Sequence, residues 1–163
     1  MIHNINLAKI LREQSKIKGD IRVAYGWLDS NKKRRTSFWK KISEASDDFL
    51  AKSNLRELWQ DELVLDYDNQ KFNGNCTSKV SEVILALYTE KFSFTCWETH
   101  SNGYHFHLEF PEMLNLNEEE RKETRRYFIE KYNADPTKIS GLISIPETPH
   151  WKSKQLMRLA AVV

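Results

Sequence analysis

The chain has 163 residues, of which 40% are hydrophobic and 29% charged, and its formal net charge is +2. This balance is typical of a globular chain with a hydrophobic core, and it excludes an intrinsically disordered or membrane-embedded protein. No apolar run approaches the ~20 residues of a membrane span, and residues 1–10 lack the layout of a secretory signal. The two cysteines, Cys76 and Cys96, form neither a zinc-type pair nor a disulfide framework. We therefore expect a single cytoplasmic domain over residues 1–163 that contacts no membrane.

The first third of the chain predicts a helix, a strand and a second helix. Apolar residues recur at helical spacing over residues 4–17, and residues 21–28 are typical of a strand. Residues 37–52 then predict another helix, which Ser37 caps.

Three clusters of basic side chains have aromatic residues beside them, although the net charge is nearly balanced. Such a mixture can contact a phosphate backbone and stack on bases, and for the first cluster an ordinary solvated loop is an equal alternative. The clusters are Lys32-Lys33-Arg34-Arg35, Lys40-Lys41 and Lys152-Ser-Lys154, beside Phe38, Trp39 and Trp151.

From residue 62 onward the pattern predicts the order strand, helix, strand, strand, helix, strand. This order is that of the ferredoxin-like or RRM-like α+β fold, in which two helices cover one face of a sheet and leave the other face available for chemistry. The preceding residues would form an amino-terminal helical and strand extension. The predicted elements are a strand at 62–68, a helix around 80–88, a hairpin of 92–98 and 104–110 around Ser101-Asn102-Gly103, a helix at 118–132 capped by Asn117, and a strand at 139–145.

Two carboxylates end the first of these strands, in the run Glu62-Leu-Val-Leu-Asp66-Tyr-Asp68. Side chains repeat every two residues along a strand, so Asp66 and Asp68 share a face, roughly 7 Å apart at Cα. Paired carboxylate oxygens suit a hard divalent cation, Mg²⁺ or Mn²⁺, better than zinc. The alternative is a strand that runs into a solvated acidic turn.

Two histidines alternate in the same way in the second strand of the hairpin. His105 and His107 are separated by one residue, so both imidazoles share a face. If this strand is the neighbour of the Asp66 strand, the imidazoles lie beside the two carboxylates. An imidazole can bind a metal or donate a hydrogen bond to a phosphate oxygen.

Three segments in this order resemble the motifs of the archaeo-eukaryotic primase superfamily. The run ending in Asp66-Tyr-Asp68 resembles the first motif, and Ser101-Asn-Gly-Tyr-His105 resembles the second. Ile143-Ser-Ile-Pro146-Glu-Thr-Pro-His150-Trp-Lys152 is similar to the closing segment of the primase small subunit. The resemblance extends over about residues 55–155.

The resemblance implies a DNA primase or primase-polymerase: a nucleotidyltransferase that makes primers on a single-stranded DNA template from nucleoside triphosphates. It implies that Asp66 and Asp68 bind two Mg²⁺ or Mn²⁺ ions, which activate the 3′-hydroxyl and stabilise the leaving pyrophosphate. His105 would contact the triphosphate. Further nucleotide and phosphate contacts would come from Ser101, His150 and Lys152. A large primase subunit or a helicase is an expected partner.

The chain departs from the family pattern at the third metal carboxylate. The nearest register of that position has Lys138, so the third ligand is expected to be Asp135 or Glu147. The arginines usual before the proline are replaced by Gly141 and Ser144, and the zinc-binding cysteines of the small subunit are absent. These departures are typical of a minimal or degenerate polymerase, for instance from a virus or plasmid.

Two alternatives use the same residues differently. In an HUH replication-initiator endonuclease, His105, His107 and Glu98 would bind the metal and Tyr127 would be the nucleophile, although Tyr127 is more typical of a core aromatic. In a non-catalytic RRM-like module, the aromatics of the sheet would bind single-stranded nucleic acid. The candidate aromatics are Trp97, Tyr104 and Phe106.

Overall fold

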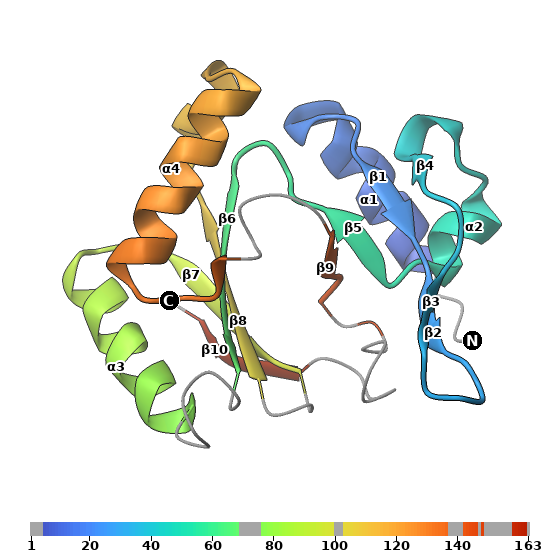
Figure 1. Cartoon of the computed structure of the whole chain (residues 1–163). Helices are drawn as coiled ribbons and strands as arrows, with labels where there is room; N and C mark the ends of the chain where they lie inside the picture. The colour runs from blue at the N-terminus through green and yellow to red at the C-terminus, as the bar shows by residue number, and fades with distance from the viewer. Residues whose placement is uncertain are drawn as a thin grey trace.

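The computed structural model describes residues 5–68, 76–99, 103–136, 142–146, 148 and 158–162. It is a mixed α+β structure with two four-stranded antiparallel sheets, a two-stranded ribbon and four α-helices in this part of the chain (Figure 1). The first sheet has the order β4-β1-β5-β9 and lies with helices α1 and α2. These elements are α1 (Ile5–Lys18), β1 (Arg22–Ala24), β4 (Lys40–Lys41), α2 (Asp47–Lys52), β5 (Leu55–Glu57) and β9 (Leu142–Ser144).

The predicted strand at 21–28 is divided in two. Its second half, β2 (Gly26–Leu28), pairs with β3 (Arg34–Thr36) in a ribbon that hydrogen-bonds to neither large sheet. The predicted helix at 37–52 is wrong over its first half, where β4 and a 3₁₀ turn (Ile42–Glu44) occur and α2 begins only at Asp47.

The physical reason for this difference is the partner that Ser37 finds. The Ser37 hydroxyl accepts a hydrogen bond from the Tyr25 backbone N–H at 3.0 Å, and the Ser37 N–H donates to the Tyr25 carbonyl at 2.9 Å. Ser37 therefore fixes the base of the ribbon, while Ser46 caps α2 by accepting from the Phe49 N–H at 3.1 Å.

The second sheet has the order β10-β7-β8-β6, with helices α3 and α4 on one of its faces (Figure 1). The predicted strands and helices from residue 62 to 132 are confirmed. Local signals explain this agreement; for example, Asn117 and Glu120 form a reciprocal capping box at the start of α4. The elements are β6 (Glu62–Asp68), α3 (Cys76–Thr89), β7 (Phe94–Glu98), β8 (Gly103–Glu109), a 3₁₀ turn (Pro111–Asn115), α4 (Glu118–Lys131) and β10 (Arg158–Val162).

The strand after α4 differs from the prediction. Instead of joining this sheet, β9 pairs with β5 in the first sheet, with Leu55 opposite Ser144. Ile143 is buried there against Leu58 and Val64, which gives β9 an apolar contact between the two sheets. The fourth strand of the second sheet is β10, which pairs with β7.

The two faces of the second sheet have opposite character. Leu63, Leu65 and Tyr67 of β6 belong to a core cluster with the apolar sides of α3 and α4. The alternate residues of β6 and β8 lie on the other side, which carries neither α3 nor α4 and which we call the helix-free face for that reason. This face is directed toward the first sheet, where α1 and β9 cover part of it. Among the described residues, no helix has the length and apolar character needed to cross a bilayer.

Candidate functional site

Asp66 and His105 are opposite each other on neighbouring strands of the helix-free face. They are Cα partners in the antiparallel β6–β8 pairing, and His105 Nε2 lies 3.3 Å from Asp66 Oδ1. Both side chains are largely withdrawn from solvent, with 17% of Asp66 and 7% of His105 exposed. The predicted convergence of a carboxylate and an imidazole from adjacent strands is therefore present, at the distance of an ion pair.

Asp68 and Asp135 lie next to this pair. Asp68 shares the face of Asp66 and is opposite Gly103, where a Cβ would be only 3.0 Å from the Tyr67 carbonyl oxygen. Glycine therefore fits this close approach of two strands, where a larger side chain would push its neighbours by a few tenths of an ångström. On the other edge of β6, the Asp135 N–H donates to the Asp66 carbonyl at 2.8 Å. This hydrogen bond places the backbone of Asp135, the predicted third ligand, beside the backbone of Asp66.

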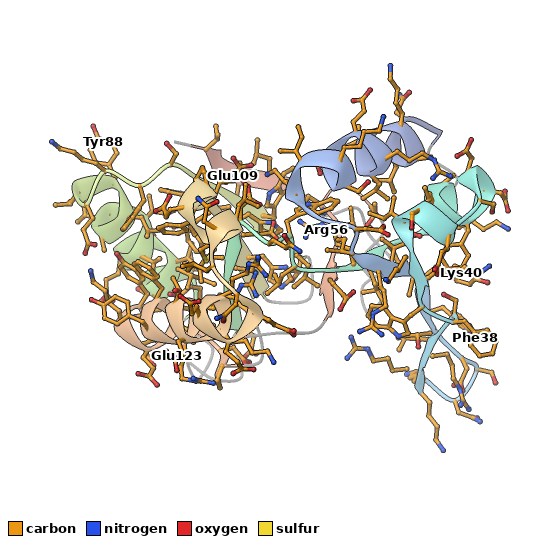
Figure 2. The ribbon with its side chains drawn as sticks, turned by 90° about the horizontal axis from the view of Figure 1, so that it is seen from above. Phe38, Lys40, Arg56, Tyr88, Glu109 and Glu123 are labelled. Atoms are coloured by element: carbon orange, nitrogen blue, oxygen red, sulfur yellow. The ribbon has the colours of Figure 1, made fainter. Side chains whose placement is uncertain are left out.

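A second imidazole–carboxylate contact lies along the same face. His107 Nδ1 is 3.3 Å from Glu62 Oε2, and Glu62 in turn accepts two hydrogen bonds from Arg56, at 2.6 and 2.7 Å. Arg56 comes from β5 of the first sheet, and Figure 2 shows it between the two halves of the molecule. The pair is buried, with 5% of Arg56 and 7% of Glu62 exposed. This bidentate contact therefore connects the two sheets at the site.

Burial and charge act in opposite directions on Glu62. Burial by itself would raise the pKa of Glu62, but the charge and hydrogen bonds of Arg56, together with His107, hold that pKa well below its usual range. Glu62 is therefore an ionised acceptor, so Nδ1 of His107 must be the nitrogen that bears the proton. Burial lowers the pKa of His107 and outweighs the contact with Glu62, which acts in the other direction. His107 is therefore neutral near pH 7.

Each imidazole has a second nitrogen that is buried and finds no hydrogen-bond partner among the residues that the structure describes. These atoms are His105 Nδ1 and His107 Nε2, and the two ring centroids are 6.4 Å apart. A buried polar atom without a partner costs free energy, and such atoms concentrate where ligands, ions or ordered water bind. The helix-free face thus has two acceptor or ligand positions that the described side chains do not satisfy.

A pocket of about 380 Å³ extends from this face toward α1. Trp97, Thr95 and His107 line it on the side of the sheet, and Ile10 and Leu11 line it on the side of α1. The volume is within the range of about 300–1,000 Å³ that is usual for small-molecule sites. Arg56 and Glu62 also contact the pocket, so it combines apolar walls with charged groups.

The donors present fit a hard divalent cation by chemical type. Asp66 and Asp68 offer carboxylate oxygens on one face, with Asp135 adjacent, and such oxygens are the ligands that Mg²⁺ and Mn²⁺ prefer. Within the described residues, no three His, Cys, Asp or Glu side chains form a group that could hold a metal ion. The four other predicted site residues, Ser101, Glu147, His150 and Lys152, lie outside the described residues.

The residues of the endonuclease alternative are not brought together. Glu98 is opposite Tyr104, one residue out of phase with the pair Trp97 and His105, so Glu98 lies on the side of the sheet away from the histidines. Tyr127 is on α4, which packs on the helix-covered face, and 60% of its surface is exposed to solvent. Tyr127 packs edge-on against Phe128, with the ring centroids 5.1 Å apart, but its exposure contradicts the expectation that it is a core aromatic.

The aromatics of the RRM-like alternative divide between the two faces. Phe106 is fully buried in the core under α3 and α4, and Tyr104 packs against the same core. Trp97 is on the helix-free face opposite His105, with its indole N–H donating to the Thr95 hydroxyl at 3.0 Å. Of these three aromatics, only Trp97 is positioned to contact a base on the helix-free face.

The lowered pKa of His107 predicts a pH dependence of stability. The unfolded chain takes up a proton near the ordinary value of 6.5, whereas the folded chain resists protonation until a lower pH. The free energy of unfolding should therefore fall as the pH drops below about 6.5, by at most ~1.4 kcal/mol per pH unit for one proton. The free energy of unfolding of His107→Gln, measured with urea, should depend less steeply on pH between pH 7 and 5 than that of the wild type. An equally steep dependence in both proteins would show that His107 is not its source.

Two members of this site were not predicted. Glu62 stands in the first motif and is four residues before Asp66, so strand periodicity alone was enough to place it on the same face. Arg56 precedes the motif in a strand of three residues that the sequence did not indicate, and its role depends on the packing of the two sheets. In comparisons with known proteins, the chain matches no family model, no curated protein and no solved structure.

Proposed function

We propose that the protein is a metal-dependent nucleotidyltransferase of the primase-polymerase type, with an RRM-like unit formed by β6 to α4. The observation that supports it best is the contact of Asp66 with His105 across two adjacent strands, on the face opposite α3 and α4. The second support is the sequence, in which three segments resemble primase motifs in the same order. The substrates would be nucleoside triphosphates and a single-stranded DNA template, with a large subunit or helicase as an expected partner.

The chemistry assigns a separate role to each group. A divalent cation held by Asp66 and Asp68 would supply Lewis acidity and neutralise charge on the phosphates. His105 would contact the triphosphate, and its contact with Asp66 fixes the orientation of its ring. The base would occupy the pocket beside Trp97, where an aromatic wall excludes water. Phosphate chemistry and base binding would therefore use adjacent parts of one face.

The proposal is tested by template-directed incorporation of labelled nucleotides. The wild-type protein, a primed and an unprimed single-stranded template, and Mg²⁺ or Mn²⁺ are incubated with each nucleotide in turn. Incorporation should depend on the template sequence and should stop when the metal is removed with EDTA. Incorporation that ignores the template would contradict the assignment, as would binding of template and nucleotide without any synthesis, which favours the non-catalytic module.

The position of Tyr127 predicts that it has no part in the chemistry. Its side chain is exposed on α4, on the opposite side of the sheet from His105 and His107. Tyr127→Phe should therefore retain full incorporation activity and the wild-type thermal midpoint. Single-stranded DNA should form no covalent adduct with either protein on a denaturing gel. A wild-type adduct that Tyr127→Phe abolishes would instead establish the endonuclease mechanism.

A further inference from the structure

The β2–β3 ribbon is an arm that projects from the first sheet. Figure 1 shows it at the same end of the molecule as the carboxyl end of β6, and Figure 2 shows Phe38 and Lys40 at the outer side of this region. Its strands pair only with each other, with Trp27 opposite Arg35 and Leu28 opposite Arg34. We call residues 26–41, which comprise this ribbon and the adjoining strand β4 at the edge of the first sheet, the basic arm.

The net charge of the basic arm is more positive than that of the whole chain. It has six basic side chains and one acidic side chain, so its net charge is +5, whereas the net charge of the chain is +2. The remaining residues are therefore net negative. All six basic side chains are exposed: Lys32, Lys33, Arg34, Arg35, Lys40 and Lys41. The one acid, Asp29, is engaged with Arg35 at 2.9 Å.

Exposed aromatic rings accompany these charges. Phe38 is 90% exposed and Trp27 is 42% exposed, so both rings offer surface to a ligand. Trp27 is stacked on Tyr25 with the ring centroids 5.8 Å apart, which fixes the orientation of the indole. Unpaired bases stack on such rings, whereas the bases of a duplex have no free faces to offer.

The arm is held in a defined shape before any ligand binds. At the turn, the Asp29 carboxylate accepts from the backbone N–H groups of Asn31 and Lys33, each at 2.9 Å. At the base, Asn54 accepts from the Gly26 N–H at 2.7 Å and donates to the Gly26 carbonyl at 3.0 Å. Such pre-organisation reduces the entropy lost when a ligand is bound.

From charge, exposed rings and rigidity together, we propose that the basic arm binds single-stranded nucleic acid, with the phosphates on Lys32, Lys33 and Arg34 and a base on Phe38. The further statement that this strand is the template rests on the proposed function. Binding of single-stranded nucleic acid does not require catalysis, so each proposal can be contradicted without the other.

The test is fluorescence anisotropy with a labelled oligo-dT of about 20 nucleotides, across about 50 to 200 mM NaCl. Three lost phosphate contacts should reduce the slope of log K against log salt by about 2, and the affinity at about 0.1 M salt by roughly 100-fold. The variant is Lys32→Ala/Lys33→Ala/Arg34→Ala. Phe38→Ala, which removes one stacking surface, should reduce the affinity about 5-fold or more with an unchanged salt slope.

The matched control removes three exposed positive charges elsewhere. Lys9→Ala/Lys16→Ala/Arg126→Ala has the same net charge as the arm variant and should bind within about 3-fold of the wild type. An equal loss in both triple variants would overturn the proposal, because net charge alone would then explain binding. Wild-type binding of a matched duplex as tight as that of the single strand would also overturn it. A wild-type protein that binds the oligonucleotide through the basic arm but incorporates no nucleotide would contradict only the proposed function.

Discussion

Asp66→Asn is expected to lower nucleotide incorporation by about 10³-fold or more, because a metal-bound carboxylate supplies several kcal/mol of transition-state stabilisation and each 1.4 kcal/mol is tenfold in rate. Asparagine has almost the same shape, so the β6–β8 pairing should persist. The change removes the negative charge that lies 3.3 Å from His105 Nε2. Template-dependent incorporation at saturating nucleotide and Mn²⁺ is the measurement.

A matched control separates the site from the general effect of losing a carboxylate. Asp48→Asn removes a carboxylate on α2 that is 63% exposed and pairs with Lys52, four residues along the same helix, at 2.9 Å. It should retain wild-type activity. Wild-type incorporation by Asp66→Asn, with circular dichroism and thermal midpoint unchanged, would exclude the polymerase assignment.

Arg56→Met is expected to cost about 3–5 kcal/mol in the free energy of unfolding, because it leaves the Glu62 carboxylate buried without its main counter-charge. The pair joins β5 to β6, so its loss also loosens the junction of the two sheets. The double variant Arg56→Met/Glu62→Met should be more stable than Arg56→Met alone, because the unpaired buried charge is removed. Urea unfolding at pH 7 measures both effects.

The Arg22–Glu57 pair provides the control for this prediction. It has the same residue types and two contacts of 3.0 Å, but 55% of Arg22 and 29% of Glu57 are exposed. Arg22→Met should cost under about 1 kcal/mol, as solvent-exposed pairs do. If Arg22→Met and Arg56→Met destabilise the protein equally, or if the double variant is less stable than Arg56→Met, burial of the Arg56–Glu62 pair is not what stabilises the junction.

Structural features that are set by residues close together in the sequence were predictable. The two-residue period of a strand placed Asp66 with Asp68 and His105 with His107, whichever strand lay beside them. The hairpin of β7 and β8 followed from a short turn, and the start of α4 followed from Asn117 and Glu120, which are three residues apart. These features are confirmed because their hydrogen bonds and side-chain directions are set within a few residues of chain.

The positions of Ser37 and Ile143 could not be predicted in this way, because their partners are distant in the sequence. A serine hydroxyl can cap a helix or accept a hydrogen bond from a neighbouring strand. Ser37 does the second, because the fold places the Tyr25 N–H next to its hydroxyl. Similarly, the apolar strand around Ile143 fitted either sheet, and the open edge of β5 with the buried contacts of Leu58 and Val64 decided its place.

The sequence by itself therefore determined the alternation that groups the carboxylates and the imidazoles, and the helices that cover the opposite face. The tertiary structure decided which sheet β9 joins, that β10 completes the second sheet, and that Arg56 reaches Glu62. The reason is physical: strand period and helix capping depend on local geometry, whereas strand partners and buried ion pairs depend on which edges and charges remain unsatisfied after distant segments pack.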